Sequence, residues 1–420
     1  LSALQIDLGP ANHEAVRQAI SGRLKSARKW ALVGGPPCQA YSLVGRSRMM
    51  GDPDFAKDER HFLYREYLKI ITDHRPPVFV MENVKGLLSA RVDGEAMINR
   101  IVADLRSPRA AIEGGLNDLT YRLYSLSEDQ QPERVVDPKL FLVRSEDHGV
   151  PQARHRMFIV GIRSDIDVRP SKLKVSKAPT VRQTIGHLPK LRSRVSRGGE
   201  RTGAWIEELA RFRDLLEDEA WTPAMANLKP TLADLLDRLD DSLPHRSDLT
   251  SAKTESAFPA LSAMADDRLR SLKSHEARTH MGSDLRRYLF AATYAELTGR
   301  SPKLADFPDA LLPDHQNVQL GREGKMFSDR FRVQVADQVS TTVTSHICKD
   351  GHYFIHYDPL QCRSLTVREA ARLQTFPDNY SFLGPRTAQY HQVGNAVPPH
   401  LARQIGEIIA DVLDAMEGEP

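Results

Sequence analysis

The stretch from Trp30 to Ser42 constrains the fold more than any other part of the chain. It reads Trp-Ala-Leu-Val-Gly-Gly-Pro-Pro-Cys-Gln-Ala-Tyr-Ser, a short apolar run that ends in glycines, prolines and a cysteine. Such a run is typical of a buried strand that stops at its Gly and Pro residues. Open α/β sheets place ligands and reactive groups beyond the carboxyl ends of their strands. The pattern therefore predicts Cys38 at a functional sheet edge; a turn that only happens to hold a thiol is the alternative.

A second apolar run, residues 78–84, reads Val-Phe-Val-Met-Glu-Asn-Val and carries a carboxylate near its end. An amphipathic helix is predicted before it, over residues 59–71. Strand, helix and strand in this order predict a parallel, right-handed crossover, which brings Cys38 and Glu82 to the same sheet edge. Taken alone, Glu82 is more typical of a capping or ion-paired acid, and its place at the same edge as Cys38 favours the functional interpretation.

A basic motif precedes a third apolar run. Residues 152–156 read Gln-Ala-Arg-His-Arg and lead into the predicted strand 157–162. Residues two apart in a strand share one face, so Arg154 and Arg156 are predicted to present a fork of hydrogen-bond donors together. Two solvated cations at a sheet edge are the alternative. Further strands are predicted at residues 3–8 (ending near Asp7), 121–126 and 140–143, with a helix at 13–24.

Composition bounds the class of protein. The chain has 420 residues, 27% charged and 40% hydrophobic, which suits a globular protein of two or three domains. No apolar run approaches the roughly 18 residues of a membrane span, so we expect no membrane association and a cytoplasmic protein. Three cysteines are too few for a disulfide framework. A net charge of +3 permits a nucleic-acid partner without requiring one.

The second half of the chain changes character. Residues 180–329 are charge-rich and helical in pattern, and they read as an inserted, separately folded region. Strands are then predicted at residues 331–335, 338–344 and 352–357. Thr366 and Glu369 form a capping box at the start of a helix that runs to Gln374. Asn395 precedes an amphipathic C-terminal helix and would suit its cap.

Four residues invite a zinc interpretation, namely His346, Cys348, His352 and His356. Their spacing matches no established zinc pattern, and alternation along strands would scatter them. We therefore expect no metal.

Five stretches together resemble the cytosine-C5 DNA methyltransferases. They are Gly35-Pro36-Pro37-Cys38-Gln39, Glu82-Asn83-Val84, Gln152-Ala153-Arg154-His155-Arg156, residues 363–377, and Gly394-Asn395-Ala396-Val397-Pro398-Pro399. They stand in the family's order, with a long variable segment between the third and the fourth. The resemblance implies an α/β fold: a Rossmann-like S-adenosylmethionine-dependent methyltransferase sheet with a smaller inserted target-recognition domain. The implied domains are residues 1–187 (catalytic, first part), 188–345 (target recognition) and 346–420 (catalytic completion).

The family's Gly-rich first motif, and the acid that follows the next strand, lie nowhere before Cys38. The chain begins at Leu1 rather than Met. We therefore expect that the first strand–helix–strand portion of the methyltransferase sheet is missing from this sequence.

The resemblance also implies a mechanism and its residues. Cys38 would add to C6 of a flipped-out cytosine, so that C5 can accept the methyl group. Glu82 would protonate or hydrogen-bond N3, Arg156 would hold O2, and Arg154 would brace the site or a phosphate. The implied cofactor is S-adenosylmethionine, bound through Asp7, Pro37, Asn395 and Val397. The implied DNA contacts are Gln39, Ser42 and Arg46.

The implied partner is double-stranded DNA of a specific sequence, in restriction–modification or epigenetic marking. A cognate restriction endonuclease acting on the same site would accompany the first of these roles, and we expect a monomer. Two alternatives stay open. A tRNA cytosine-C5 methyltransferase shares the fold, although the long variable segment favours duplex readout. A non-catalytic DNA-binding fragment would lack cofactor binding.

Overall fold

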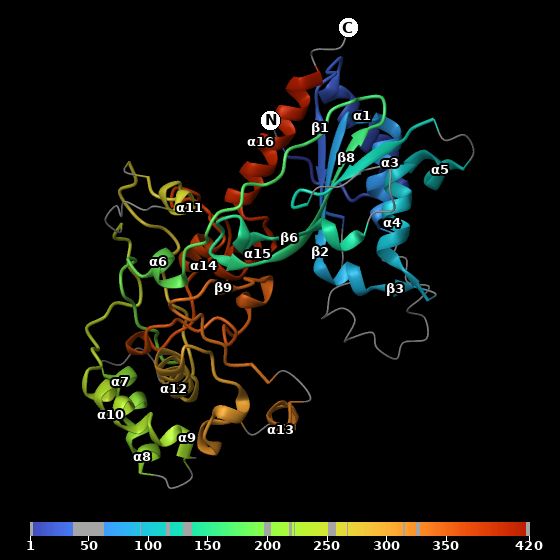
Figure 1. Ribbon diagram of the computed structural model, residues 1–420. Helices are drawn as coiled ribbons and strands as arrows, with labels where there is room; N and C mark the ends of the chain where they lie inside the picture. Colours follow the sequence, from blue (N-terminus) through green and yellow to red (C-terminus); the bar gives the residue numbers. More distant parts are fainter. Residues whose placement is uncertain are drawn as a thin grey trace. The chain divides into compact units, whose positions relative to one another are not determined.

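Two compact units make up the computed structural model (Figure 1). It describes residues 3–36, 63–92, 94–114, 118–128, 137–196, 203–217, 221, 223–250, 258–266, 268–313, 316–324 and 328–416. The first unit comprises residues 1–144, 155–174 and 403–420, and the second comprises residues 145–154 and 175–402.

A five-stranded mixed sheet forms the centre of the first unit. Its strand order is β1-β2-β8-β5, and β6 also pairs with β8. The strands are β1 (Ala31–Gly34), β2 (Val78–Val84), β5 (Tyr121–Tyr124), β6 (Leu142–Arg144) and β8 (His155–Arg163). β1 and β2 are parallel, which confirms the predicted parallel pairing, and the partners of β8 all run antiparallel to it.

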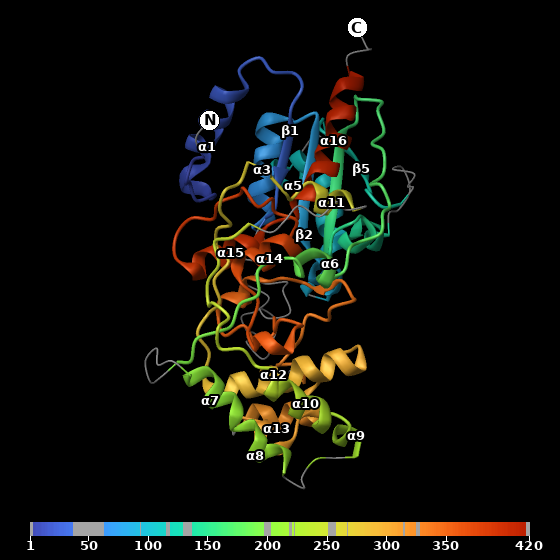
Figure 2. The same cartoon turned by 90° about the vertical axis from the view of Figure 1, so that its left-hand side faces the viewer.

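Helices cover both faces of this sheet, as Figures 1 and 2 show. Apolar residues of α3 and α4 pack with Phe79, Met81 and Ile159 in one core. The residues of α16 that belong to this unit lie along the opposite face (Figures 1 and 2). The elements of this unit outside the sheet are η1 (Pro10–Asn12), α1 (His13–Leu24), α3 (Tyr64–His74), η4 (Lys85–Ser89), β3 (Arg91–Val92), β4 (Glu95–Ala96), α4 (Met97–Arg106), α5 (Pro108–Glu113), η5 (Pro138–Phe141) and most of α16 (Pro399–Ala415).

The N-terminal prediction is half right. The helix predicted at 13–24 is α1, but residues 3–8 form no strand. A strand exists only where its backbone groups find partners in a ladder, and most of these residues are exposed to water instead. The helix predicted at 59–71 is α3, which begins at Tyr64; residues 59–62 lie outside the described part of the chain.

Helices and turns dominate the second unit. Its elements are η6 (Ser145–Asp147), β7 (Gln152–Ala153), α6 (Val181–Ile185), α7 (Ala204–Ala210), α8 (Phe212–Leu216), α9 (Pro223–Ala226), α10 (Lys229–Asp237), α11 (Pro259–Ser262), α12 (Gly282–Thr298), η7 (Leu304–Asp306), η8 (Asp309–Leu311), α13 (Gln316–Arg322), β9 (Ser340–Thr341), η9 (Ser345–Cys348), η10 (Pro359–Gln361), α14 (Val367–Leu373) and α15 (Arg386–Asn395). One core gathers around α12, and a second forms between α6, α14 and α15. The capping box of Thr366 and Glu369 opens α14 as predicted.

The three strands predicted between residues 331 and 357 are largely wrong. Only β9 forms there, with isolated bridges at Val333 and Ile355. Side-chain amides take the place of neighbouring strands. The Thr341 N–H donates to Gln334 Oε1 and the Val343 N–H to Gln152 Oε1, at 2.9 and 2.7 Å. Backbone donors that are satisfied in this way need no ladder.

Within the described residues, every helix is too short or too polar to cross a lipid bilayer.

Candidate active site

A buried tyrosine ties together the two parallel strands that lead to the site. Tyr67 of α3 donates its hydroxyl hydrogen to the carbonyl oxygens of Val80 and Leu32, at 3.0 and 3.2 Å. Its ring lies against Gly34, where a Cβ atom would come within 2.6 Å of a ring carbon. Glycine at the end of β1 is therefore what lets the helix approach the strand so closely.

The end of β2 contacts the backbone that follows β1. Asn83 donates its side-chain N–H to the Pro36 carbonyl at 3.4 Å and accepts from the Val84 N–H at 2.8 Å. Gly35 lies beside the Glu82 carboxylate, since a Cβ there would stand 3.1 Å from Oε2. The first residues of the Gly-Pro-Pro-Cys motif thus lie against Glu82 and Asn83, as the crossover predicts.

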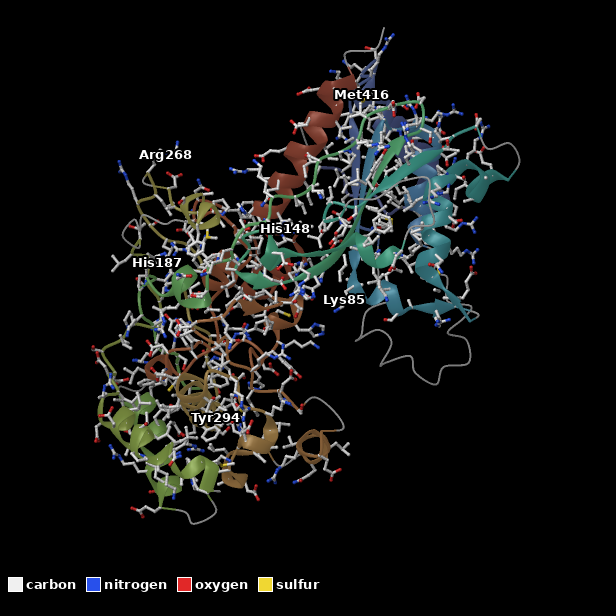
Figure 3. All side chains as sticks on the ribbon, viewed as in Figure 1. Lys85, His148, His187, Arg268, Tyr294 and Met416 are labelled. Atoms are coloured by element: carbon white, nitrogen blue, oxygen red, sulfur yellow. The ribbon has the colours of Figure 1, made fainter. Side chains whose placement is uncertain are left out.

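Glu82 forms an ion pair with Arg156. The distance from Arg156 Nε to Glu82 Oε1 is 3.2 Å, and the two side chains are 17% and 24% exposed. Arg156 is opposite Val84 in the antiparallel register, so it is a diagonal neighbour of Glu82 on the same sheet face. An acid and a donor-rich cation are therefore held together near the carboxyl end of β2, and both side chains are partly exposed to solvent. Lys85, labelled in Figure 3, begins η4 directly after this strand.

Five predicted site residues lie outside the described part of the chain: Pro37, Cys38, Gln39, Ser42 and Arg46. The structure therefore describes Gly35 and Pro36, at the start of the cysteine motif, but not Cys38 itself.

Arg154 is engaged differently from the prediction. Its guanidinium is buried, and Nη1 donates to the carbonyls of Val343 and Gly394, at 3.0 and 3.3 Å. Residue 154 lies between β7 and β8 and outside both strands, so strand alternation does not place it with Arg156. The prediction of a shared fork is wrong for this reason. Arg154 braces backbone segments of the second unit.

Two buried glutamines extend this bracing. The Gln152 side chain donates from Nε2 to Gln374 Oε1 and to the Leu373 carbonyl, both at 3.1 Å. Gln374 Nε2 donates in turn to the Val393 carbonyl at 2.7 Å. Together with Arg154, these bonds join three of the five motifs in one network.

The structure gives different surroundings to the three described residues that were predicted to bind the cofactor. Asp7 is exposed, in the non-helical segment before η1. Asn395 is also exposed; it ends α15 and does not cap the following helix, because α16 begins at Pro399. Val397 is half-buried in the turn between these helices. Gly394 directly precedes Asn395 and contacts the Ser345 backbone so closely that a Cβ would come within 2.4 Å of the Ser345 backbone nitrogen.

A buried ion pair supports the start of α14. Arg363 donates to both oxygens of Glu369 at 2.7 Å, and each side chain is 1% exposed. Burial disfavours the charged carboxylate, but the Arg363 guanidinium outweighs this and holds the pKa of Glu369 well below its usual range. The second Glu369 oxygen also accepts from the Thr366 N–H at 2.7 Å. This network fixes the helix that carries Gln374.

The described residues contain no cluster of three or more side chains suited to hold a metal ion. The candidate zinc ligands serve separate contacts instead. His352 Nδ1 pairs with the Tyr288 hydroxyl at 2.7 Å, and His356 Nδ1 accepts from the Asp358 N–H at 3.0 Å. Cys348 Sγ lies 3.3 Å from His391 Nε2.

Tyr67 supports the end of β1 in the first unit, and Gln152 and Gln374 link motif segments within the second; the sequence assigned none of them a role. For Gln374 one sequence signal was available. The capping box locates the helix that Gln374 directly follows, and a glutamine at such a position is rarely buried without a specific partner. Tyr67 gave no such signal, because a tyrosine on an apolar helix face is ordinary core.

Comparison with known proteins identifies the family. The model of the C-5 cytosine-specific DNA methylase family matches residues 24–411. A type II methyltransferase of Bacillus paralicheniformis is 33% identical over 388 residues, which are 91% of this chain and 70% of that protein. A DNA (cytosine-5-)-methyltransferase of Aeropyrum pernix is 26% identical over 92% of this chain and 82% of its own length.

Among solved structures, a putative DNA modification methyltransferase encoded within an Escherichia coli prophage aligns with a TM-score of 0.49 at 18% identity. The alignment covers 94% of this chain and 83% of that one. The match of the family model over most of the chain, together with the 33% identical relative, decides the assignment. The chain belongs to the C-5 cytosine-specific DNA methylase family, and it is a DNA (cytosine-5-)-methyltransferase.

Proposed function

We propose that the chain methylates C5 of a flipped-out cytosine in a specific duplex DNA sequence, with Cys38 as the nucleophile. The observation that carries this proposal is the Glu82–Arg156 pair at the end of β2, beside Gly35 and Pro36. An acid and a cation held against the start of the Gly-Pro-Pro-Cys motif are the groups that activation of a cytosine ring requires.

The chemistry follows from the weak nucleophilicity of C5. The Cys38 thiolate adds to C6, and this makes C5 electron-rich enough to attack a methyl donor. In its protonated form, Glu82 stabilises the adduct by donating a proton or a hydrogen bond to N3. Arg156 orients the cytosine by donating hydrogen bonds to the O2 atom of the base, and its ion pair with Glu82 keeps that carboxyl group in place. A base such as water then takes the C5 proton, and the C5–C6 double bond re-forms as the C6–S bond breaks and the Cys38 thiolate leaves.

We propose S-adenosylmethionine as the methyl donor, the cofactor this family uses. It supplies an electrophilic methyl group on a sulfonium sulfur. The exposed Asp7 carboxylate suits an adenine amino group, and the exposed Asn395 amide with the half-buried Val397 suits a polar ligand that has an apolar part. These residue types suit the cofactor, and Pro37 is the fourth residue that we assign to it.

The DNA contacts are proposed on the same basis. Gln39, Ser42 and Arg46 follow the nucleophile and suit phosphate contacts, and base extrusion gives the thiol access to C6. Residues 188–345 form the proposed target-recognition domain, between catalytic parts at 1–187 and 346–420. We further propose a monomeric protein in the bacterial nucleoid that protects the site of a cognate restriction endonuclease, because relatives are type II methyltransferases.

The test is mechanism-based trapping. Duplex DNA containing 5-fluorocytosine is incubated with the protein and S-adenosylmethionine, and denaturing gels detect a covalent adduct. Fluorine cannot leave C5 as a proton does, so a working enzyme stays bound through Cys38. We expect an adduct with wild type and with Cys348→Ser, which changes a partly exposed thiol elsewhere, and none with Cys38→Ser.

The other outcomes contradict separate parts of the proposal. An adduct that survives Cys38→Ser removes Cys38 from the mechanism. Trapping on 5-fluorocytosine tRNA and not on duplex DNA would show that the substrate is tRNA and that the proposed DNA substrate is wrong. Folded protein that neither binds the cofactor nor forms an adduct makes the chain a non-catalytic DNA-binding module.

A further inference from the structure

Two glutamines that lie 222 residues apart form a buried amide pair in the second unit. Gln152 and Gln374 are each 0% exposed, and their side chains are joined by the 3.1 Å bond from Nε2 of Gln152 to Oε1 of Gln374. Each amide is also bonded to backbone on its far side. Gln152 Oε1 accepts from the Val343 N–H at 2.7 Å. Gln374 Nε2 donates to the carbonyls of Val393 and Ala396, at 2.7 and 3.4 Å.

A buried amide pair costs free energy of folding unless its donors and acceptors are hydrogen-bonded. Burying an amide without partners costs about 2–7 kcal/mol, depending on the reference environment, so apolar residues would fill this space more safely. When all members are satisfied, a buried polar network fixes one arrangement of the segments that it joins. This network joins the backbone before Arg154 to the backbone that contains Asn395.

Neighbouring contacts hold the same two segments. Arg154 Nη1 reaches the Gly394 carbonyl at 3.3 Å, and Gly394 itself leaves no room for a Cβ against Ser345. Thr342 Oγ1 donates to the Ala153 carbonyl at 2.6 Å. Residues 393–396 are therefore held at their backbone from several sides, and the exposed Asn395 side chain is left to face a ligand.

We infer that Gln152 and Gln374 are positioning residues, which hold the segment 393–396 in the geometry that binds S-adenosylmethionine and tie it to the Arg154 segment. The inference rests on the proposed role of Asn395 and Val397 at the cofactor. Both glutamine side chains are fully buried, so we assign them no direct contact with the cofactor. Loss of the pair would let the segment move, and this would weaken cofactor binding before it affected the cysteine chemistry.

The test is Gln374→Met, which keeps the length of the side chain and removes its bonds. We expect KM for S-adenosylmethionine, and Kd for S-adenosylhomocysteine measured by calorimetry, to rise about tenfold, as losing one or two neutral hydrogen bonds implies. At saturating cofactor, kcat and the rate of adduct formation stay within about twofold of wild type, because Cys38 and Glu82 are untouched.

Gln334→Met is the matched control. Gln334 is 1% exposed in the same unit, donates to the Tyr353 carbonyl at 2.9 Å and accepts from the Thr341 N–H at 2.9 Å, so these bonds hold residues other than 393–396. It should lose comparable stability in urea and leave KM for the cofactor unchanged. Gln152→Met should raise KM as well, and the double variant should raise it less than the product of the two single effects.

Folded Gln374→Met or Gln152→Met with an unchanged KM overturns the inference, and so does an equal rise in Gln334→Met. If one variant fails to fold, the other decides. Wild-type protein that neither binds S-adenosylhomocysteine nor methylates DNA would contradict the proposed function instead, so the two failures are distinguishable.

Discussion

Replacing Tyr67 with phenylalanine should separate stability from catalysis. The hydroxyl of Tyr67 is its only polar group, and it bonds to carbonyls of both β1 and β2. Burial raises the pKa of Tyr67, so the group remains a neutral donor in the folded protein. The ring also meets Phe79 edge-on, with centroids 6.1 Å apart, and phenylalanine keeps that contact. Tyr67→Phe therefore removes one hydroxyl and nothing else.

The magnitude follows from that single loss. A net hydrogen bond contributes about 0.5–1.5 kcal/mol, and leaving a buried acceptor unsatisfied raises the cost to about 1–3 kcal/mol. Val80 lies in the middle of the sheet and Leu32 in its first strand, so we expect a loss near 2 kcal/mol in the free energy of unfolding (about the middle of that range). Urea denaturation followed by circular dichroism measures it. The end of β1 should also become more mobile. We therefore expect slower trapping of the protein on 5-fluorocytosine DNA.

Tyr121→Phe provides the control. Tyr121 is 3% exposed in the same sheet, and its hydroxyl donates to the Pro76 carbonyl at 2.9 Å, before the start of β2. We expect a similar loss of stability and a normal trapping rate, because this bond is remote from Gly34. Equal slowing in both variants would refute the reasoning, since catalysis would then follow overall stability rather than the end of β1.

Three further predictions concern other contacts. Gly34→Ala places a Cβ 2.6 Å from a ring carbon of Tyr67, and we expect thermal denaturation to show a loss of about 1–3 kcal/mol from the forced shift. Glu369→Gln leaves the Arg363 guanidinium buried without its counter-charge, so urea midpoints should report a loss of about 3–5 kcal/mol; a loss within error would contradict this. Burial, reinforced by nearby cations, lowers the pKa of His280 well below 6.5, so only the unfolded chain gains a proton as the pH falls through that value. The contribution of His280 to the free energy of unfolding should therefore be constant above pH 6.5 and fall by up to about 1.4 kcal/mol per pH unit below it, so the measured slope should be shallower in His280→Gln.

The features that the sequence predicted correctly are those decided by neighbouring residues. The run before Gly34 and the run before Glu82 become parallel strands because each is apolar and the connection between them has room for a helix. The capping box of Thr366 and Glu369 involves only backbone and side chains within one turn. For such features, local periodicity and spacing hold the necessary information.

Two of the failures share a physical cause. Strand periodicity placed Arg154 beside Arg156, but the chain leaves regular strand geometry at residue 154 and buries that guanidinium against two carbonyls. The β-branched residues after Val335 favour strands, yet the amides of Gln334 and Gln152 bond to their backbone instead. In each case a polar side chain took over the hydrogen bonding that a sheet would otherwise supply.

Such substitutions escape sequence analysis because the partners are distant along the chain. Gln152 and Val343 are 191 residues apart, and Arg154 and Gly394 are 240 apart. No window of neighbouring residues contains both members of either pair. The motif order nevertheless makes these contacts reasonable afterwards: residues that must act on one base and one cofactor have to be fixed to each other, and backbone carbonyls offer acceptors at every residue. Gln152, Gln374 and Arg154 lie within the motifs and link them to one another, and the local sequence cannot reveal the partners that they bind.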